Sequence, residues 1–134
     1  IPHNADLVFD LRFLRNPHWD NILRPLTGLD EGVSHYVEAD PAYDAAMEKI
    51  RDLLRYLLPL YDAQGKAYVN IAFGCTGGRH RSVLVAEQFG RWLREDGFDP
   101  AVNHRNLTSR PIDAIEEPAN GANKNSAPQG NDIT

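Results

Sequence analysis

The apolar residues of this chain fall into two kinds of pattern, short runs and stripes with helical spacing. Short runs over residues 7–13, 68–73 and 98–104 predict strands, because they are brief and rich in branched and aromatic side chains. Between them, apolar positions recur every three or four residues, which predicts helices over residues 42–62 and 82–96. The two stripes consist of Met47, Ile50, Leu54, Leu57, Leu58 and Tyr61, and of Val83, Ala86, Phe89 and Leu93.

Turn residues mark the ends of these elements. Asp40 and Pro41 suit the N-cap and the first turn of the first helix. Gly65 and Gly97 suit the turns that follow the two helices. Residues 14–40 carry no clear period and are predicted to form a loop. The turn signals within this loop are Asn16-Pro17, Arg24-Pro25 and Thr27-Gly28.

The order of strand, helix, strand, loop, helix and strand predicts a small three-layer α/β domain over residues 1–110, with a mostly parallel sheet. Residues 111–134 are rich in Pro, Asn, Ala and Gly and lack an apolar period. They bury too little surface to offset their chain entropy, so they are predicted to form a disordered tail. The chain begins with Ile rather than Met, which suggests a piece of a longer protein.

Charge and cysteine content narrow the function classes. The chain has 14 Lys and Arg against 19 Asp and Glu, and this net charge of −5 argues against a general nucleic-acid coat. A single cysteine excludes an internal disulfide and a cysteine-built zinc site, and it fits a reducing, cytoplasmic location. No apolar run approaches the ~18 residues of a membrane span, so no membrane partner is expected.

The strongest chemical signal is the segment GCTGGRHRS at residues 74–82, between the second strand and the second helix. Its glycines let successive N–H groups point into one concavity, and the following helix adds its own free N–H groups. Two arginines and a histidine add positive charge, so the segment predicts a site for phosphate or a similar anion. Its candidate ligand-binding residues are Cys75, Thr76, Gly77, Gly78, His80, Arg81 and Ser82.

Two other interpretations of this segment stay open. It could be a tight turn whose glycines serve packing alone. It also fits the Cys-x5-Arg-Ser arrangement of cysteine phosphatases, with Cys75 as nucleophile, Arg81 as phosphate cradle and Asp20 as acid. Against this, Gly74 stands where such enzymes usually have His. Cys75 could equally be a small packed residue.

A second group of polar residues follows the first strand. Ligands of parallel sheets bind outside the carboxyl ends of the strands, so this group would face residues 74–82 if the first two strands are neighbours. The alternative is that Asp10 and Arg12 form a structural ion pair and the rest merely packs. The members of the group are Asp10, Arg12, Asn16, His18, Arg24, Thr27 and Gly28.

Two further groups of residues are weaker candidates for binding sites. A basic stripe could hold RNA phosphates, although acidic residues interrupt it and a solvated helix face is more common. It would consist of Arg79, Arg81, Arg91, Arg94, His104, Arg105 and Arg110. A metal site built from His18, His80 and His104 has no supporting ligand spacing, so neither a metal nor a cofactor is expected.

Several blocks of the sequence resemble, in order, the C-terminal domain of the RapZ/YvcJ family of RNase adapter proteins. They are residues 5–13, 16–19, 24–30, 74–83 and 104–107. The resemblance implies a fold similar to a sugar-phosphate-binding subdomain of phosphofructokinase, self-association, and an N-terminal P-loop nucleotide-binding domain elsewhere in the protein. It implies no phosphatase activity.

The resemblance also implies a function, namely binding of glucosamine-6-phosphate and of small RNAs, one of which is presented to RNase E. The implied sugar-phosphate contacts are Asp10, Arg12, His18, Thr76, Gly77, Gly78, His80 and Arg81. The implied RNA contacts are Arg79, His80, Arg81 and Arg105, with His104 beside them. RNA-binding members carry a Lys/Arg-rich tail, whereas an acidic stretch follows Leu107 here, which weakens the RNA role and leaves the sugar-phosphate pocket intact.

Overall fold

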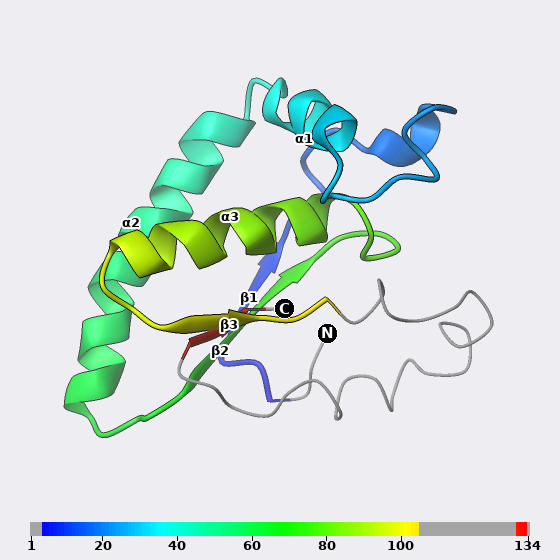
Figure 1. The fold of residues 1–134 in the computed structure, drawn as a ribbon. Coiled ribbons are helices and arrows are strands. Elements are labelled where there is room, and N and C mark those ends of the chain that lie inside the picture. Colours follow the sequence, from blue (N-terminus) through cyan, green and yellow to red (C-terminus); the bar gives the residue numbers. More distant parts are fainter. Residues whose placement is uncertain (1–3, 105–130, 134) are drawn as a thin grey trace.

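The computed structural model describes residues 4–104 and 131–133 of the chain (Figure 1). The predicted α/β class with a parallel sheet is confirmed. The elements are β1 (Leu7–Asp10), a short 3-10 helix η1 (Pro17–Trp19), α1 (Glu31–Glu38), α2 (Tyr43–Ala63), β2 (Val69–Gly74), α3 (Arg81–Glu95), β3 (Pro100–Val102) and β4 (Asn131–Ile133).

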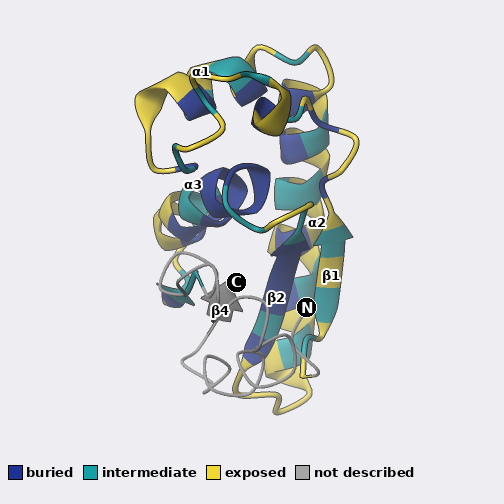
Figure 2. Cartoon of the chain, turned by 90° about the vertical axis from the view of Figure 1, so that its right-hand side faces the viewer, coloured by how far each residue is buried: buried dark blue, intermediate teal, exposed yellow. Residues whose placement is uncertain are grey.

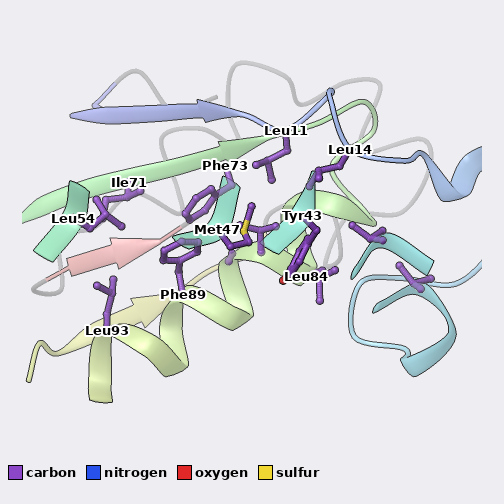
Figure 3. Packing of buried hydrophobic residues seen from close by; sticks show 14 of the residues in the cluster. Leu11, Leu14, Tyr43, Met47, Leu54, Ile71, Phe73, Leu84, Phe89 and Leu93 are labelled. Atoms are coloured by element: carbon purple, nitrogen blue, oxygen red, sulfur yellow. The ribbon is translucent and has the colours of Figure 1, made fainter. Parts of the chain in front are cut away.

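The sheet has the order β1-β2-β4-β3, and every neighbouring pair is parallel. The connections through α2 and α3 run in the same direction across the sheet, and right-handed crossovers of this kind place both helices on one face. Figure 3 shows Leu54 of α2 and Phe89 of α3 on the same side of β2 as Ile71 and Phe73. Helices α2 and α3 therefore both pack on this face of the described sheet.

The core lies between this face of the sheet and the two long helices. Figure 2 shows β2 as a largely buried strand, whereas β1 alternates between half-buried and exposed residues. Stacked rings of Phe9, Phe73 and Phe89 run from the sheet into α3. Both predicted stripes face this core, because each of their residues is buried or half-buried. Helix α2 continues through Pro59 to its end at Ala63.

Helix α1 lies within the segment that the sequence predicted to be a loop. Only Val33 and Val37 are buried from its eight residues, so its apolar stripe is a single pair at helical spacing. The turn that precedes it is held by Asp30, whose Oδ2 accepts a hydrogen bond of 2.8 Å from the amide of Thr27. A short helix with one apolar pair gives little periodicity against such strong turn signals.

Most of the predicted tail, together with Arg105 and Arg110, lies outside the described residues. Within the tail, residues Asn131–Ile133 are described, and they pair with β2 and β3 as β4. These three residues therefore differ from the expectation of no element. Parallel pairing is made by backbone groups, and three residues are too few to show a pattern of alternation. None of the described helices is both long enough and apolar enough to span a bilayer.

Asp96, just after α3, ties that helix to α2 and gives a prediction for stability. It accepts hydrogen bonds from Arg51 at 2.9 and 3.2 Å and from Arg55 at 2.9 and 3.0 Å. These bonds, those from Arg51 first, lower the pKa of Asp96 from its usual 3.8 to about 2. The ionised carboxylate therefore stabilises the folded state above the unfolded pKa, and this contribution disappears as the pH falls through the folded pKa.

We expect Asp96→Asn to lower the free energy of unfolding by roughly 1–2 kcal/mol near neutral pH, because charge-assisted hydrogen bonds are lost. The difference from the unchanged chain should shrink between about pH 4 and about pH 2, where Asp96 itself becomes protonated. Urea unfolding at three pH values measures this. Asp62→Asn, an exposed acidic position at the end of α2, is the control. An equal loss at all pH values would contradict the role of the Asp96 charge.

Candidate functional site

The carboxyl ends of β1 and β2 lie side by side. Asp10 is in register with Gly74, and the amide of Leu11 donates a hydrogen bond of 2.8 Å to the carbonyl of Gly74. The segment after β1 and the loop after β2 therefore leave the sheet at the same edge. The structure thus brings together the two groups of polar residues that the sequence had placed at separate strand ends.

The loop over residues 75–80 exposes part of its backbone. Gly77 and Gly78 have φ values of +80° and +65°, which side chains rarely tolerate, so both positions require glycine. Across residues 4–104 and 131–133, Thr76 and Gly78 form neither a hydrogen bond nor an ion pair. Their amide groups and the Thr76 hydroxyl are thus available to a ligand beside the first turn of α3, where a helix attracts anions.

The start of the loop is fastened to α3 through Cys75. The amide of Ser82 donates a hydrogen bond to Cys75 Sγ at 3.3 Å. This contact uses the thiol as an acceptor and orients it toward the helix. The proposed phosphatase acid, Asp20, is engaged in its own turn, where its Oδ1 accepts from the amides of Ile22 and Leu23 at 2.8 and 3.1 Å.

Arg81 points away from the loop and into the protein. Its side chain is buried, with the residue only 2% exposed. One nitrogen, Nη1, donates to the carbonyl oxygen of Leu14 at 2.9 Å and to that of Arg12 at 3.2 Å. The guanidinium group therefore holds the segment after β1 against α3. Its Nη1 is thereby engaged with these two carbonyls, whereas a Cys-x5-Arg phosphatase needs the guanidinium group to hold a phosphate at the cysteine.

His80 is also turned inward and is 5% exposed. Its Nε2 lies 3.1 Å from the carbonyl oxygen of Arg24, and since a carbonyl can only accept, Nε2 carries a hydrogen. Burial lowers the pKa of His80, which favours the neutral ring. Beside it, the amide of Gly28 donates to the carbonyl of Arg79 at 2.9 Å. Residues 24–28 are thus fastened to the beginning of α3.

Asp10 and Arg12 form an exposed, bidentate ion pair at the carboxyl end of β1. Arg12 Nη2 lies 2.6 Å from Asp10 Oδ2, and Arg12 Nε lies 3.0 Å from both carboxylate oxygens. The hydrogen bonds from Arg12 lower the pKa of Asp10 to about 2, and the charge of Arg81 adds a small contribution. Both partners are therefore charged and accessible to a ligand.

The other predicted residues after β1 shape the loop itself. Asn16 caps η1, because its Oδ1 accepts from the amide of His18 at 3.0 Å. Arg24 Nε donates to the carbonyl of His18 at 2.7 Å, and Thr27 Oγ1 accepts from an amide two residues ahead at 3.1 Å. The ring of His18 is exposed and packs edge-on against Trp19. Of this set, His18 is the side chain left most available.

The residues predicted to contact RNA fall in two places, with Arg79, His80 and Arg81 at the start of α3 and His104 after β3. His104 Nε2 lies 2.6 Å from Glu87 Oε2 on α3, so its ring is engaged in a contact after β3. Arg79 reaches the carbonyl of Pro25 at 3.4 Å. Arg105 lies outside the described residues. In the part of the chain that is described, no three His, Cys, Asp or Glu side chains gather as metal ligands would.

The profile of the RapZ C-terminal domain family matches residues 1–108 of the 134. The chain belongs to the RapZ C-terminal domain family. The family expected from the sequence blocks is therefore confirmed. The matched region contains β1, β2, α3 and the whole loop at the strand ends, so the site described above lies within the matched domain.

Curated relatives agree with this assignment. A protein of Novosphingobium aromaticivorans named nucleotide-binding protein is 63% identical over 116 residues, covering 87% of this chain and 38% of the relative. Its namesake in Sphingopyxis alaskensis is 59% identical over 116 residues, covering 87% and 37%. One in Zymomonas mobilis is 49% identical over 130 residues, covering 97% and 39%. The chain thus spans less than two fifths of these relatives' length, and their names describe binding rather than an enzymatic activity.

Proposed function

We propose that this domain binds a phosphorylated amino sugar, of the glucosamine-6-phosphate type, at the edge where β1 and β2 end. The observation that carries the proposal is the exposed loop of Thr76, Gly77 and Gly78 at the first turn of α3. The amides of Thr76 and Gly78, which form no hydrogen bond among the described residues, and the helix N-terminus together favour a phosphate group. Family membership supports the same ligand class through the resemblance given above.

The ion pair beside the loop would recognise the two charges of such a ligand. Arg12 can turn its fork from Asp10 to the phosphate oxygens, because both side chains are exposed and their pairing is worth little in water. Asp10 is ionised and would then accept hydrogen bonds from the sugar ammonium group. A ligand that carries both charges replaces the internal pair with two new contacts.

In this proposal the buried members of the predicted set act indirectly. Arg81, His80 and Gly28 hold the segment after β1 and residues 24–28 against α3. They position the exposed residues and do not touch the ligand. The ligand contacts are then the exposed residues Asp10, Arg12, His18, Thr76 and Gly77, together with the half-buried Gly78.

We further propose that ligand binding controls an adapter role toward a small RNA and an RNase E-type partner in the cytoplasm. Family membership supports this step. The cationic side chains near the loop support it as well, because a bound phosphate leaves less positive charge for a second anion. A gel shift with a small regulatory RNA tests it. Affinity should fall steeply with salt and should fall again when the sugar phosphate is added.

The sugar-phosphate site is tested by calorimetry on the full chain. We expect glucosamine-6-phosphate to bind, and glucosamine and fructose-6-phosphate each to bind at least about tenfold more weakly, because each lacks one of the two charged contacts. Thr76→Val should weaken the phosphate ligands alone. Equal affinity for glucosamine and its phosphate, or binding to neither, would reject a phosphate-directed site.

Arg12→Gln is the variant that tests the proposed phosphate contact most directly. We expect it to remove the preference for the phosphorylated sugar while changing the free energy of unfolding by less than about 1 kcal/mol, because the ion pair with Asp10 is exposed. Arg91→Gln, an exposed arginine on α3, is the matched control and should leave binding unchanged. Calorimetry and urea unfolding on the same samples separate the two effects. Retained preference in Arg12→Gln would contradict the proposed role of Arg12.

A further inference from the structure

A concave site lies between α2 and α3, apart from the loop at the strand ends. It is a groove of about 430 Å³, within the size range of small-molecule pockets. Met47 and Trp92 contribute apolar surface to its lining, and most of the other lining residues are charged. The lining residues are Glu38, Tyr43, Asp44, Met47, Glu48, Arg51, Asp52, Arg55, Gln88 and Trp92.

Carboxylates follow one wall of the groove at a regular spacing. Asp44, Glu48 and Asp52 are four residues apart on α2, and all three line the groove. A helix rises 1.5 Å per residue, so their attachment points are spaced about 6 Å along the axis. Within the described chain, Asp44, Glu48 and Glu38 form no ion pair, and Asp52 has only a loose one at 3.7 Å with Arg55.

The two arginines of the groove make their short contacts with a different carboxylate. Arg51 and Arg55 both direct their guanidinium forks to Asp96, at the end of α3. Arg51 also lies over the ring of Trp92, 5.1 Å from its centroid. Apart from the 3.7 Å contact of Arg55 with Asp52, their charges are paired outside the row of carboxylates. Acidic residues outnumber the arginines in the lining, so the groove keeps a negative potential.

Tyr43 provides an independent sign of a missing partner. The residue is 5% exposed, lines the groove, and carries a buried hydroxyl group with no hydrogen-bond partner among the described residues. Buried polar groups are normally paired, so an orphaned hydroxyl at a cavity wall marks a place for a ligand atom. Burial and the nearby charge of Glu38 raise the pKa of Tyr43 to about 12, so the group remains a neutral phenol. Figure 3 shows its ring among the core residues.

We propose that this groove binds a linear aliphatic polyamine. Ammonium groups separated by three or four methylenes lie about 5–6 Å apart, which matches the spacing of the carboxylates on α2. The methylene chain would lie on Met47 and Trp92, and one ammonium group would donate to the oxygen of Tyr43. This site is separate from the sugar-phosphate site, and its test does not depend on that one.

The test uses the fluorescence of Trp92. The chain has two tryptophans, and Trp19 is exposed, so Trp19→Phe leaves Trp92 as the only reporter. Titration with spermidine should give a saturable change, whereas butylamine, with one ammonium group, should bind at least about tenfold more weakly. Glu48→Gln should weaken spermidine about fivefold, and Asp62→Asn, outside the groove on the same helix, should not.

Tyr43→Phe separates a ligand contact from a structural role. Removal of an unpaired buried hydroxyl should leave the melting temperature unchanged or higher, because the group has no partner to lose. We expect spermidine to bind several-fold more weakly to this variant. Unchanged binding would overturn the contact with Tyr43 and, with it, the proposed site.

Two further ligands complete the test. If Mg²⁺ and spermidine change the fluorescence of Trp92 equally, and Glu48→Gln affects neither change, the cations are attracted non-specifically. That result would overturn the proposal. Tighter binding of a lysine-rich peptide than of spermidine would overturn it in favour of a protein-docking surface. Saturation by spermidine alone, lost in Glu48→Gln and weakened in Tyr43→Phe, would support it.

Discussion

Replacing Gly28 with alanine is expected to lower the free energy of unfolding by about 3 kcal/mol, at the upper end of what overpacking costs. A Cβ atom at this position would lie 2.4 Å from the carbonyl oxygen of His80 and 2.4 Å from the amide nitrogen of Leu84. Both are backbone atoms of α3 and its N-cap, so neither can move aside as a side chain would. The segment before α1 would have to separate from α3.

Urea unfolding of Gly28→Ala and of the unchanged chain measures the effect. Gly32→Ala in α1 is the matched control, because its Cβ would meet only the end of the Leu23 side chain, at 3.2 Å. Alanine favours helices over glycine by up to about 1 kcal/mol, so Gly32→Ala should be neutral or stabilising. Comparable losses in both variants would contradict the close approach at Gly28.

The long elements of the fold could be predicted because their signals are local. The stripe from Met47 to Tyr61 and the run at residues 68–73 each show their period within one window of sequence. Helix α1, with two buried valines, and β4, with three residues, are too short to show one. The strand order also depends on backbone pairing between distant segments, which no local pattern contains.

The sequence predicted the backbone conformation of the candidate site, but it predicted the directions of the side chains only in part. Adjacent glycines after a strand indicated the exposed loop, and their left-handed φ values agree with that reason. The direction of a side chain depends on what surrounds it in space. Arg81 contacts carbonyls about seventy residues away in sequence, and Gly28 meets α3 across more than fifty residues. Composition therefore identified both residues and could not identify what they touch.

The groove between α2 and α3 was missed for a related reason. The apolar stripe of helix α2 predicts a core helix, which is confirmed for Met47 and Leu54. The row of Asp44, Glu48 and Asp52 at four-residue spacing was visible in the sequence as a second stripe on the same helix. Its significance depends on Trp92 and Tyr43 lying opposite and beside it, which requires α3 to be in place.

Replacing Arg81 with methionine should also cost about 3 kcal/mol, by a different mechanism. Methionine fills much of the same volume but cannot donate, so the carbonyl groups of Leu14 and Arg12 lose the donor that they share inside the protein. Each buried carbonyl left unpaired costs about 1–3 kcal/mol. Arg81→Lys should recover only part of the loss, because a single ammonium group does not reproduce the planar guanidinium.

The same variant distinguishes a structural role of Arg81 from direct contact with the ligand. If Arg81 held the phosphate directly, Arg81→Met would lose sugar-phosphate binding at little cost in stability. We expect the reverse order, with a large loss of stability in urea unfolding and a binding loss that follows only from the displaced segment after β1. Arg79→Met, where the arginine makes one long contact of 3.4 Å to the Pro25 carbonyl, is the control and should unfold like the unchanged chain. If the Arg81→Met variant is stable but no longer binds glucosamine-6-phosphate, Arg81 contacts the ligand directly and the structural role is wrong.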